Sequence, residues 1–133
     1  MVAAVVYLDA SAIVRLVLEE PGSEALLVYL HEHPVRVTSA LSTAEVVRAV
    51  RRSGGTLDRL VRATAVLDRI DRVDLSRDLL RRAGELEPPS LRTLDAIHLA
   101  TALEVGPLAG FVAYDVRLAA AAAAYGLTVE APV

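Results

Sequence analysis

The 133-residue sequence contains no cysteine, which excludes disulfides, thiolate catalysis and cysteine-ligated zinc. Lysine is also absent, so all 14 basic residues are arginines. No apolar stretch reaches the roughly 18 residues that a membrane span needs. The chain does not open with a basic segment, an apolar stretch and a small-residue cleavage site, so we expect no signal peptide. These absences lead us to expect a cytoplasmic protein that does not enter a membrane.

Hydrophobic residues make up 54% of the chain, well above the share that disordered proteins show. A chain of 133 residues has room for one real hydrophobic core but not for two. The sequence contains no internal repeat and no linker. We therefore predict a single globular domain over residues 1–133.

Charge is distributed unevenly along the sequence. The net charge of −3 argues against a simple basic coat for nucleic acid. Ten arginines lie between Arg48 and Arg82 against five aspartates, and the rest of the chain carries a net charge of −8. Within that span three Asp–Arg pairs have i,i+4 spacing, which is typical of exposed helices. Three arginines without an acid downstream are the better candidates for phosphate contact: Arg48, Arg51 and Arg52.

Short β-branched stretches alternate with helical patterns along the whole chain. We predict strands over residues 2–8, 35–38, 73–75, 110–114 and 127–130. We predict one helix after Asp9, with Ser11 as its N-cap, and further helices over 23–33, 42–52, 57–70, 79–86, 94–105 and 116–125. This order predicts an α/β fold, with a central, mostly parallel sheet of about five short strands and helices on both faces.

Four acidic residues occupy positions that such a topology brings to one edge of the sheet. Asp9 and Asp115 follow predicted strands, Asp95 begins a predicted helix, and Glu45 lies inside another. Ligands of parallel α/β sheets bind at the carboxyl ends of the strands. Taken singly, Asp9 and Asp95 also fit helix N-caps, Glu45 an ordinary surface residue and Asp115 a turn.

Convergence of these carboxylates would be costly without a counter-charge. Two like charges about 4 Å apart repel by about 4 kcal/mol at an effective dielectric near 20. The cluster must then protonate in part or bind a cation. Oxygen ligands without histidine or cysteine favour Mg²⁺ or Mn²⁺ over zinc. Carboxylate-held Mg²⁺ is typical of enzymes that hydrolyse phosphodiesters.

Four segments resemble those of PIN-domain nucleases, in the same order and over essentially the whole chain. They are Leu-Asp-Ala-Ser-Ala at 8–12, Ser-Thr-Ala-Glu at 42–45, Thr-Leu-Asp-Ala-Ile-His-Leu-Ala at 93–100 and Ala-Tyr-Asp-Val-Arg-Leu at 113–118. Length and detail resemble the VapC toxins of type II toxin–antitoxin systems. The resemblance implies a PIN-like fold and Mg²⁺-dependent endoribonuclease activity on RNA. It also implies a homodimer that a cognate VapB antitoxin holds inactive.

The resemblance assigns metal ligation first to Asp9 and Asp95. Asp115 then completes the site, and Glu45 either ligates the metal or positions its water. Many relatives carry a further acid or Asn two residues after the last Asp, where this chain has Arg117. The resemblance therefore leaves the number of metal ions open.

Four other residues near these acids have both a structural and a functional interpretation. Ser11 and Thr93 are either helix caps or residues that orient Asp9, Asp95 or the substrate. Arg48 either lies on a solvated helix face or contacts phosphate. His98 fits a hydrogen-bonded, partly buried residue better than a catalytic base.

Other functions are less compatible with the sequence. Phospho-acceptor domains generally use a lysine, and phosphatases of the Asp-x-Asp type need an acid where Ser11 stands. Neither G-x-x-x-x-G-K nor G-x-G-x-x-G occurs in the chain. Two alternatives stay open: a non-catalytic PIN-like module that acts by binding, and a DNase.

Overall fold

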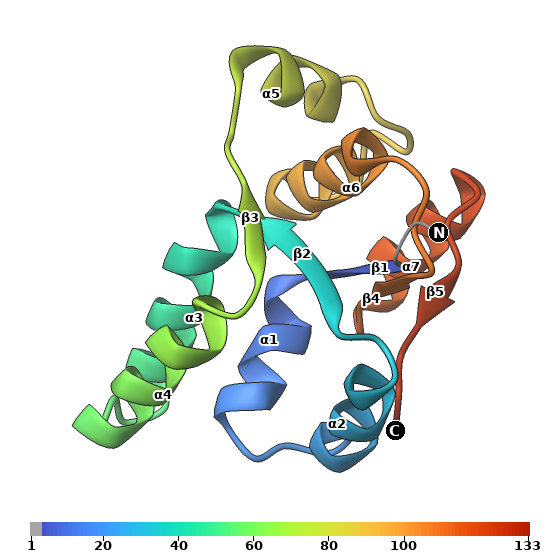
Figure 1. Cartoon of the computed structure of the whole chain (residues 1–133). Helices are drawn as coiled ribbons and strands as arrows, with labels where there is room; N and C mark the ends of the chain where they lie inside the picture. The colour runs from blue at the N-terminus through green and yellow to red at the C-terminus, as the bar shows by residue number, and fades with distance from the viewer. Residues whose placement is uncertain (1–3) are drawn as a thin grey trace.

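The computed structural model describes residues 4–133, and within them five strands form one sheet (Figure 1). The strand order is β3-β2-β1-β4-β5, and all four neighbouring pairs are parallel. The strands are β1 (Val5–Leu8), β2 (Val35–Ser39), β3 (Asp71–Val73), β4 (Gly110–Val112) and β5 (Val129–Glu130). The predicted α/β fold is confirmed, and positions 2 and 3 of the first predicted strand lie outside the described residues.

Seven helices in the described part connect these strands. They are α1 (Ala10–Val17), α2 (Ser23–His31), α3 (Leu41–Arg52), α4 (Leu57–Leu67), α5 (Arg77–Gly84), α6 (Thr93–Val105) and α7 (Val116–Ala124). Each predicted helix is present to within a few residues. None of the helices in residues 4–133 combines the length and the hydrophobicity of a membrane span.

The alternation of side chains along the strands divides the core into two layers. Val6 and Leu8 of β1 pack with the buried faces of α1, α2, α3 and α4. Tyr7, between them, packs on the opposite face with Phe111 of β4 and with buried residues of α6 and α7. Figure 1 shows α6 on one side of the sheet and α1 and α2 on the other. Helices therefore cover both faces, as predicted.

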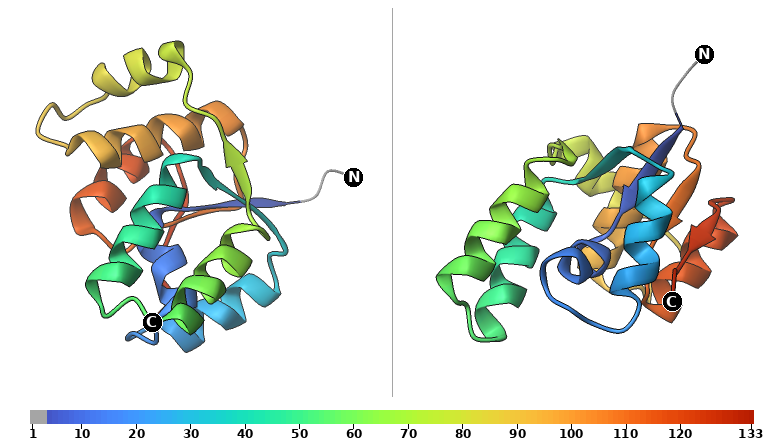
Figure 2. Two further views of the ribbon diagram at one scale, coloured as in Figure 1. Left: turned by 90° about the vertical axis from the view of Figure 1, so that its left-hand side faces the viewer. Right: turned by 60° about the horizontal axis from the view of Figure 1, so that its bottom comes forward.

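The outer helices pack against other helices. Helix α5 packs on α6 through a cluster that contains Leu79, Ala83 and Ile97. Helices α3 and α4 lie side by side and contact α1, on the side of the molecule away from β5 (Figure 2). Two of the three expected i,i+4 ion pairs on these outer elements form, Asp68 with Arg72 at 3.4 Å and Asp78 with Arg82 at 3.3 Å.

The third pair at this spacing, Asp58 and Arg62, forms no ion pair among residues 4–133. The Nε of Arg62 donates instead to the backbone oxygen of Leu16, at 3.2 Å. This contact draws the arginine across to α1, and it satisfies a carbonyl in the last turn of that helix.

Two predicted helix caps are wrong. The N-cap of α1 is Asp9, because only this residue separates the end of β1 from the start of the helix. Ser11 already lies inside the first turn. The N-cap position of α6 is Arg92, and its side chain makes no capping bond. Thr93 is the first residue of that helix and is exposed.

Candidate active site

Three of the four acidic residues predicted as ligands follow the carboxyl ends of strands, and the fourth, Asp95, lies at the start of a helix that follows another helix. Asp9 caps α1 directly after β1, and Asp115 caps α7 shortly after β4. Glu45 lies in the second turn of α3, after β2, and Asp95 lies in the first turn of α6. The backbone N–H of Asp9 donates to Val112 at 3.1 Å, so the ends of β1 and β4 adjoin. We call Asp9, Glu45, Asp95 and Asp115 the acidic edge.

Asp9 is the buried member of the acidic edge, with an exposed fraction of 5%. Its Oδ1 accepts two hydrogen bonds, from the hydroxyl of Ser11 at 2.7 Å and from the backbone N–H of Ala12 at 2.9 Å. Burial raises the pKa of Asp9, these two bonds oppose the rise, and the charge of Asp95 adds to it. In the described part of the chain no hydrogen bond reaches Oδ2, which therefore remains for a ligand.

Glu45 is tied to the core through His98. Its Oε1 lies 2.6 Å from Nε2 of that ring, and Nδ1 lies 2.7 Å from the hydroxyl of Tyr7. His98 is 2% exposed, and Tyr7 is fully buried. Burial strongly raises the pKa of Tyr7, so its hydroxyl keeps its proton. Three side chains thus form one hydrogen-bonded chain from the sheet to the acidic edge.

Asp95 and Asp115 share an arginine. Nη2 of Arg92 lies 3.2 Å from Oδ2 of Asp95 and 3.3 Å from Oδ2 of Asp115. The other oxygen of Asp115 caps α7, since it accepts from the backbone N–H groups of Arg117 and Leu118. The side chain of Arg92 is 68% exposed, so solvent screens both ion pairs.

The acids are therefore neighbours, but each is held by protein partners. Charge effects on the pKa of Asp9 place Asp95 and His98 close to it. His98 connects to Glu45, and Arg92 connects Asp95 to Asp115. With the side chains so arranged, no three histidine or acidic side chains of residues 4–133 form a group that could hold a metal ion.

A small cavity of about 280 Å³ opens beside this cluster, between α1 and α3. Ser11 lines it together with two acidic residues, Glu20 and Glu45, and two basic residues, Arg15 and Arg52. Arg15 lies 4.0 Å from Glu20, and its guanidinium lies over the ring of Tyr114 at 3.6 Å. The cavity thus brings two arginines next to the acidic edge, one of them paired with an acid.

The other predicted site residues lie in different surroundings. Ser11 contacts Asp9, which agrees with the interpretation that it orients this carboxylate. Thr93 lines a separate cavity with the Pro88-Pro89 turn, and Arg92, rather than Thr93, contacts Asp95. Arg48 is exposed on α3, while Arg52, one turn further along, lines the cavity with Glu45.

Sequence reasoning missed two partners of the acidic edge. Arg92 precedes Asp95 by three residues, a spacing at which helical side chains meet, so it could have been found. His98 lies in a helix whose interior, from Ala96 to Ala102, is buried throughout. A histidine among such neighbours needs a hydrogen-bond partner, but the sequence does not say that the partner is Glu45.

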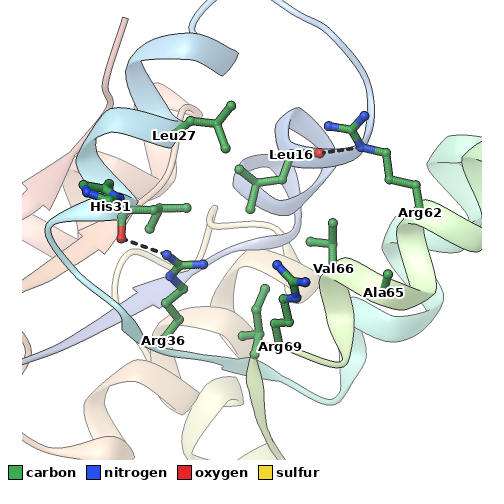
Figure 3. Close-up of a pocket in the computed structure, with 10 residues that line it drawn as sticks. Leu16, Leu27, His31, Arg36, Arg62, Ala65, Val66 and Arg69 are labelled. Atoms are coloured by element: carbon green, nitrogen blue, oxygen red, sulfur yellow. Dashed lines mark hydrogen bonds between the residues drawn. The ribbon is translucent and has the colours of Figure 1, made fainter.

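A larger cavity, of about 460 Å³, lies elsewhere, between α1, α2 and α4 (Figure 3). Arg36, Arg62 and Arg69 line it among leucines and other apolar side chains, and no acidic residue does. Two of these arginines bond to backbone oxygens, Arg36 to Leu30 at 2.8 Å and Arg62 to Leu16 at 3.2 Å. This cavity therefore has no part in carboxylate chemistry.

The donors of the acidic edge fit a hard divalent cation. They are all carboxylate oxygens, the ligands that Mg²⁺ and Mn²⁺ prefer. A cation would relieve the burial of Asp9 and its repulsion from Asp95, both of which raise the pKa of Asp9. Arg92 must leave Asp95 and Asp115 first, which costs little because exposed ion pairs contribute only about 0–1 kcal/mol each.

Comparison with known families identifies one that spans most of the chain. The PIN domain model matches residues 6–124. Ribonuclease VapC46 of Mycobacterium tuberculosis is 45% identical over 130 residues, which cover 97% of this chain and 98% of the relative. Ribonuclease VapC35 of the same organism is 40% identical over 132 residues, 96% of each chain.

Solved structures share the fold at lower identity. Mycobacterium tuberculosis VapC20, described as a sarcin–ricin loop cleaving toxin, matches with a TM-score of 0.75 and 19% identity, over 96% of this chain and 99% of its own. VapBC2 of Rickettsia felis, bound to promoter DNA, matches with a TM-score of 0.73 and 16% identity, over 97% of this chain and 99% of its own. A toxin–antitoxin complex of Klebsiella pneumoniae matches with a TM-score of 0.66 and 18% identity, over 84% of this chain and 88% of its own.

Proposed function

Because the chain belongs to the PIN domain family and to its VapC group, we propose that it is a metal-dependent endoribonuclease that acts as the toxin of a type II toxin–antitoxin system. One observation carries this proposal. Four carboxylates from separate segments lie at the carboxyl edge of the sheet, and the most buried of them, Asp9, keeps one oxygen open. The names of the curated relatives favour RNA over DNA as the substrate.

We assign metal binding to Asp9, Asp95 and Asp115, with Glu45 as a fourth ligand or as the residue that orients the attacking water. Mg²⁺ is the expected ion, and Mn²⁺ suits the same oxygens. Such an ion activates water and stabilises charge on the phosphate and the leaving oxygen. Ser11 and the N-terminus of α1 hold Oδ1 of Asp9, which fixes the direction of Oδ2.

The cavity between α1 and α3 is the proposed path of the RNA strand. Arg52 lines this cavity, and Arg48 lies one turn before it on α3, so both can pair with phosphates that flank the scissile bond. Arg15 is fixed against Tyr114 and contributes charge from the opposite wall. Positive side chains thus lead a polyanion to the acidic edge.

We also propose a homodimer, a VapB-type antitoxin as the partner, and a cytoplasmic location. The toxin–antitoxin complex among the structural neighbours supports the partner. Co-expression with the product of the adjacent short reading frame tests it, since an antitoxin co-purifies with the chain and suppresses cleavage. A monomeric mass by light scattering at high concentration would refute the dimer.

The proposal is tested by mapping RNA ends after incubation of the purified protein with total RNA. We expect cleavage with Mg²⁺ or Mn²⁺, none with a chelator, and none with single-stranded DNA of matched sequence. Asp9→Asn should remove both cleavage and growth inhibition on expression. Cleavage that persists in chelator contradicts the metal, and a wild-type protein that binds RNA without cutting it supports a binding module instead.

A further inference from the structure

The Tyr7–His98–Glu45 chain connects residues that are far apart in the sequence. Tyr7 lies 91 residues before His98, and Glu45 lies 53 residues before it. Both hydrogen bonds are short, at 2.7 and 2.6 Å. Tyr7 and His98 are buried, whereas Glu45 is 23% exposed and lines the cavity beside the acidic edge. The chain therefore runs from the core to the surface where the proposed chemistry takes place.

The direction of each hydrogen bond follows from counting protons. Nε2 of His98 lies 2.6 Å from Oε1 of Glu45, and because a carboxylate oxygen accepts, Nε2 carries a hydrogen. The Tyr7 hydroxyl lies 2.7 Å from Nδ1, and Thr101, Thr38 and the backbone of Ser39 are its other neighbours. The hydroxyls of Thr101 and Thr38 donate their own hydrogens to the backbone oxygens of Ile97 and Leu8, so the phenol is free to donate to Nδ1.

His98 is therefore a donor to the carboxylate of Glu45. Oε1 accepts from Nε2, and no other hydrogen bond in the described residues involves Glu45 side-chain oxygens. One carboxylate oxygen is thus fixed from the core, and the other is left to the solvent side.

We propose that His98 is a positioning residue for Glu45, which holds Oε1 so that Oε2 remains available to the acidic edge, and that Tyr7 anchors the imidazole ring through Nδ1. The inference rests on the proposed function of Glu45. Buried polar chains that are fully satisfied give rigidity to the group they hold.

Three variants separate positioning from folding. His98→Leu fills the space but removes the donor, and it should lower kcat for RNA cleavage by roughly 10–100-fold, the usual cost of losing such a supporting hydrogen bond. The KM for RNA should stay within about twofold, since the residue lies behind the carboxylate and not in the RNA path. His98→Gln places an amide N–H near the position of Nε2 and should recover part of the loss.

Tyr7→Phe should keep the fold and remove the hydroxyl that contacts Nδ1 of His98. Its ring still stacks on Phe111, whose centroid lies 5.4 Å away. We expect kcat to fall by roughly 3–10-fold, because Nδ1 then loses the partner that anchors the ring and Nε2 is held less firmly against Glu45. Tyr29→Phe is the matched control: this tyrosine lies on α2, away from His98, and should cleave at the wild-type rate.

Long-range ¹H–¹⁵N spectra of the histidine rings give a readout that does not need activity. For His98 they should show hydrogen on Nε2 and none on Nδ1 in the wild type, and a shifted Nδ1 resonance in Tyr7→Phe, where Nδ1 loses the hydrogen bond from the phenol. Hydrogen on Nδ1 in the wild type, or a Tyr7→Phe spectrum that matches it, overturns the inference.

The same experiments distinguish the two proposals. If the wild type does not cleave RNA, the proposed function fails and the spectra alone decide whether Tyr7 donates to Nδ1 of His98. If the wild type cleaves and Tyr7→Phe and His98→Gln, folded by circular dichroism, cleave equally well, His98 does not position Glu45. Should His98→Leu fail to fold, these two variants carry the test.

Discussion

Two parts of the acidic edge, Glu45 on the one hand and Asp95 with Asp115 on the other, are held by different kinds of contact. Glu45 accepts a 2.6 Å hydrogen bond from a ring that is almost completely buried. Asp95 and Asp115 instead contact one arginine, at 3.2 and 3.3 Å, and the side chain of that arginine is 68% exposed. A buried, satisfied hydrogen bond is rigid, whereas an exposed ion pair exchanges readily with solvent and salt.

This difference indicates which half is prepared for chemistry in advance. Glu45 has its direction set by the core and does not need a ligand to order it. Asp95 and Asp115 pair with the exposed side chain of Arg92, which the proposed divalent cation would replace. The structure thus combines a fixed part with an exchangeable part, and variants in each half should differ in kind as well as in size.

The largest effect is expected in the exchangeable half. Asp95→Asn removes a proposed ligand and should lower RNA cleavage by roughly 1,000-fold, because a bound metal supplies several kcal/mol of transition-state stabilisation. Initial rates at saturating Mg²⁺ measure this effect. Activity within tenfold of the wild type would exclude Asp95 from the metal site.

A smaller effect is expected in the fixed half. Glu45→Gln keeps an acceptor for Nε2 of His98 and so keeps the local structure, but it removes the negative charge. Cleavage should fall by about 10–100-fold, with an unchanged unfolding temperature. If this variant unfolds at a lower temperature than the wild type, the hydrogen bond from His98 depends on the charge of Glu45. That result would contradict the contrast between a rigid Glu45 and an exchangeable pair of aspartates.

Removal of Arg92 should strengthen metal binding. Arg92→Ala eliminates the competing cation; Arg92 makes two exposed ion pairs, each worth about 0.2–1 kcal/mol, so affinity for Mn²⁺ should rise by about 2–30-fold. Arg117→Ala is the matched control, because it removes an equal charge from an exposed residue two positions after Asp115. Equal gains in both variants would reduce the effect to general electrostatics.

The smallest effect concerns stability without metal. Burial raises the pKa of Asp9, so the carboxylate penalises the folded state at pH values above this raised pKa, and the penalty is absent below the ordinary aspartate pKa. Asp9→Asn keeps a good N-cap and removes the penalty, so its unfolding temperature should exceed that of the wild type, by roughly 3–5 °C for each kcal/mol relieved. The gain should be larger at pH 8 than near pH 4, and the opposite order would contradict the burial argument.

Much of the fold was predictable because hydrophobic periodicity records which faces are buried. The end of the first strand at Leu8 and the helix of residues 93–105 were predicted almost to the residue, since both elements are buried along most of their length. The edge strand β3 lies two residues earlier than predicted. Its first two residues, Asp71 and Arg72, are exposed, and exposure removes the apolar alternation that marks a strand.

The site was predictable only as far as topology determines it. Parallel strands bring residues after their carboxyl ends to one edge, which placed Asp9 and Asp115 together. The partners of the acids depend on tertiary packing. His98 meets Glu45 because α6 and α3 cover different faces of the sheet and meet at its edge, and no local pattern encodes that contact.

Calorimetric titration of Mn²⁺ into the metal-free wild type and into Asp9→Asn tests the central claim most directly. The acidic edge should bind the ion in the wild type, and binding should be lost in a variant that keeps the shape and the N-cap of Asp9 but not its charge. Equal affinity and stoichiometry in the two proteins would show that the carboxylates at this edge of the sheet do not hold a metal ion.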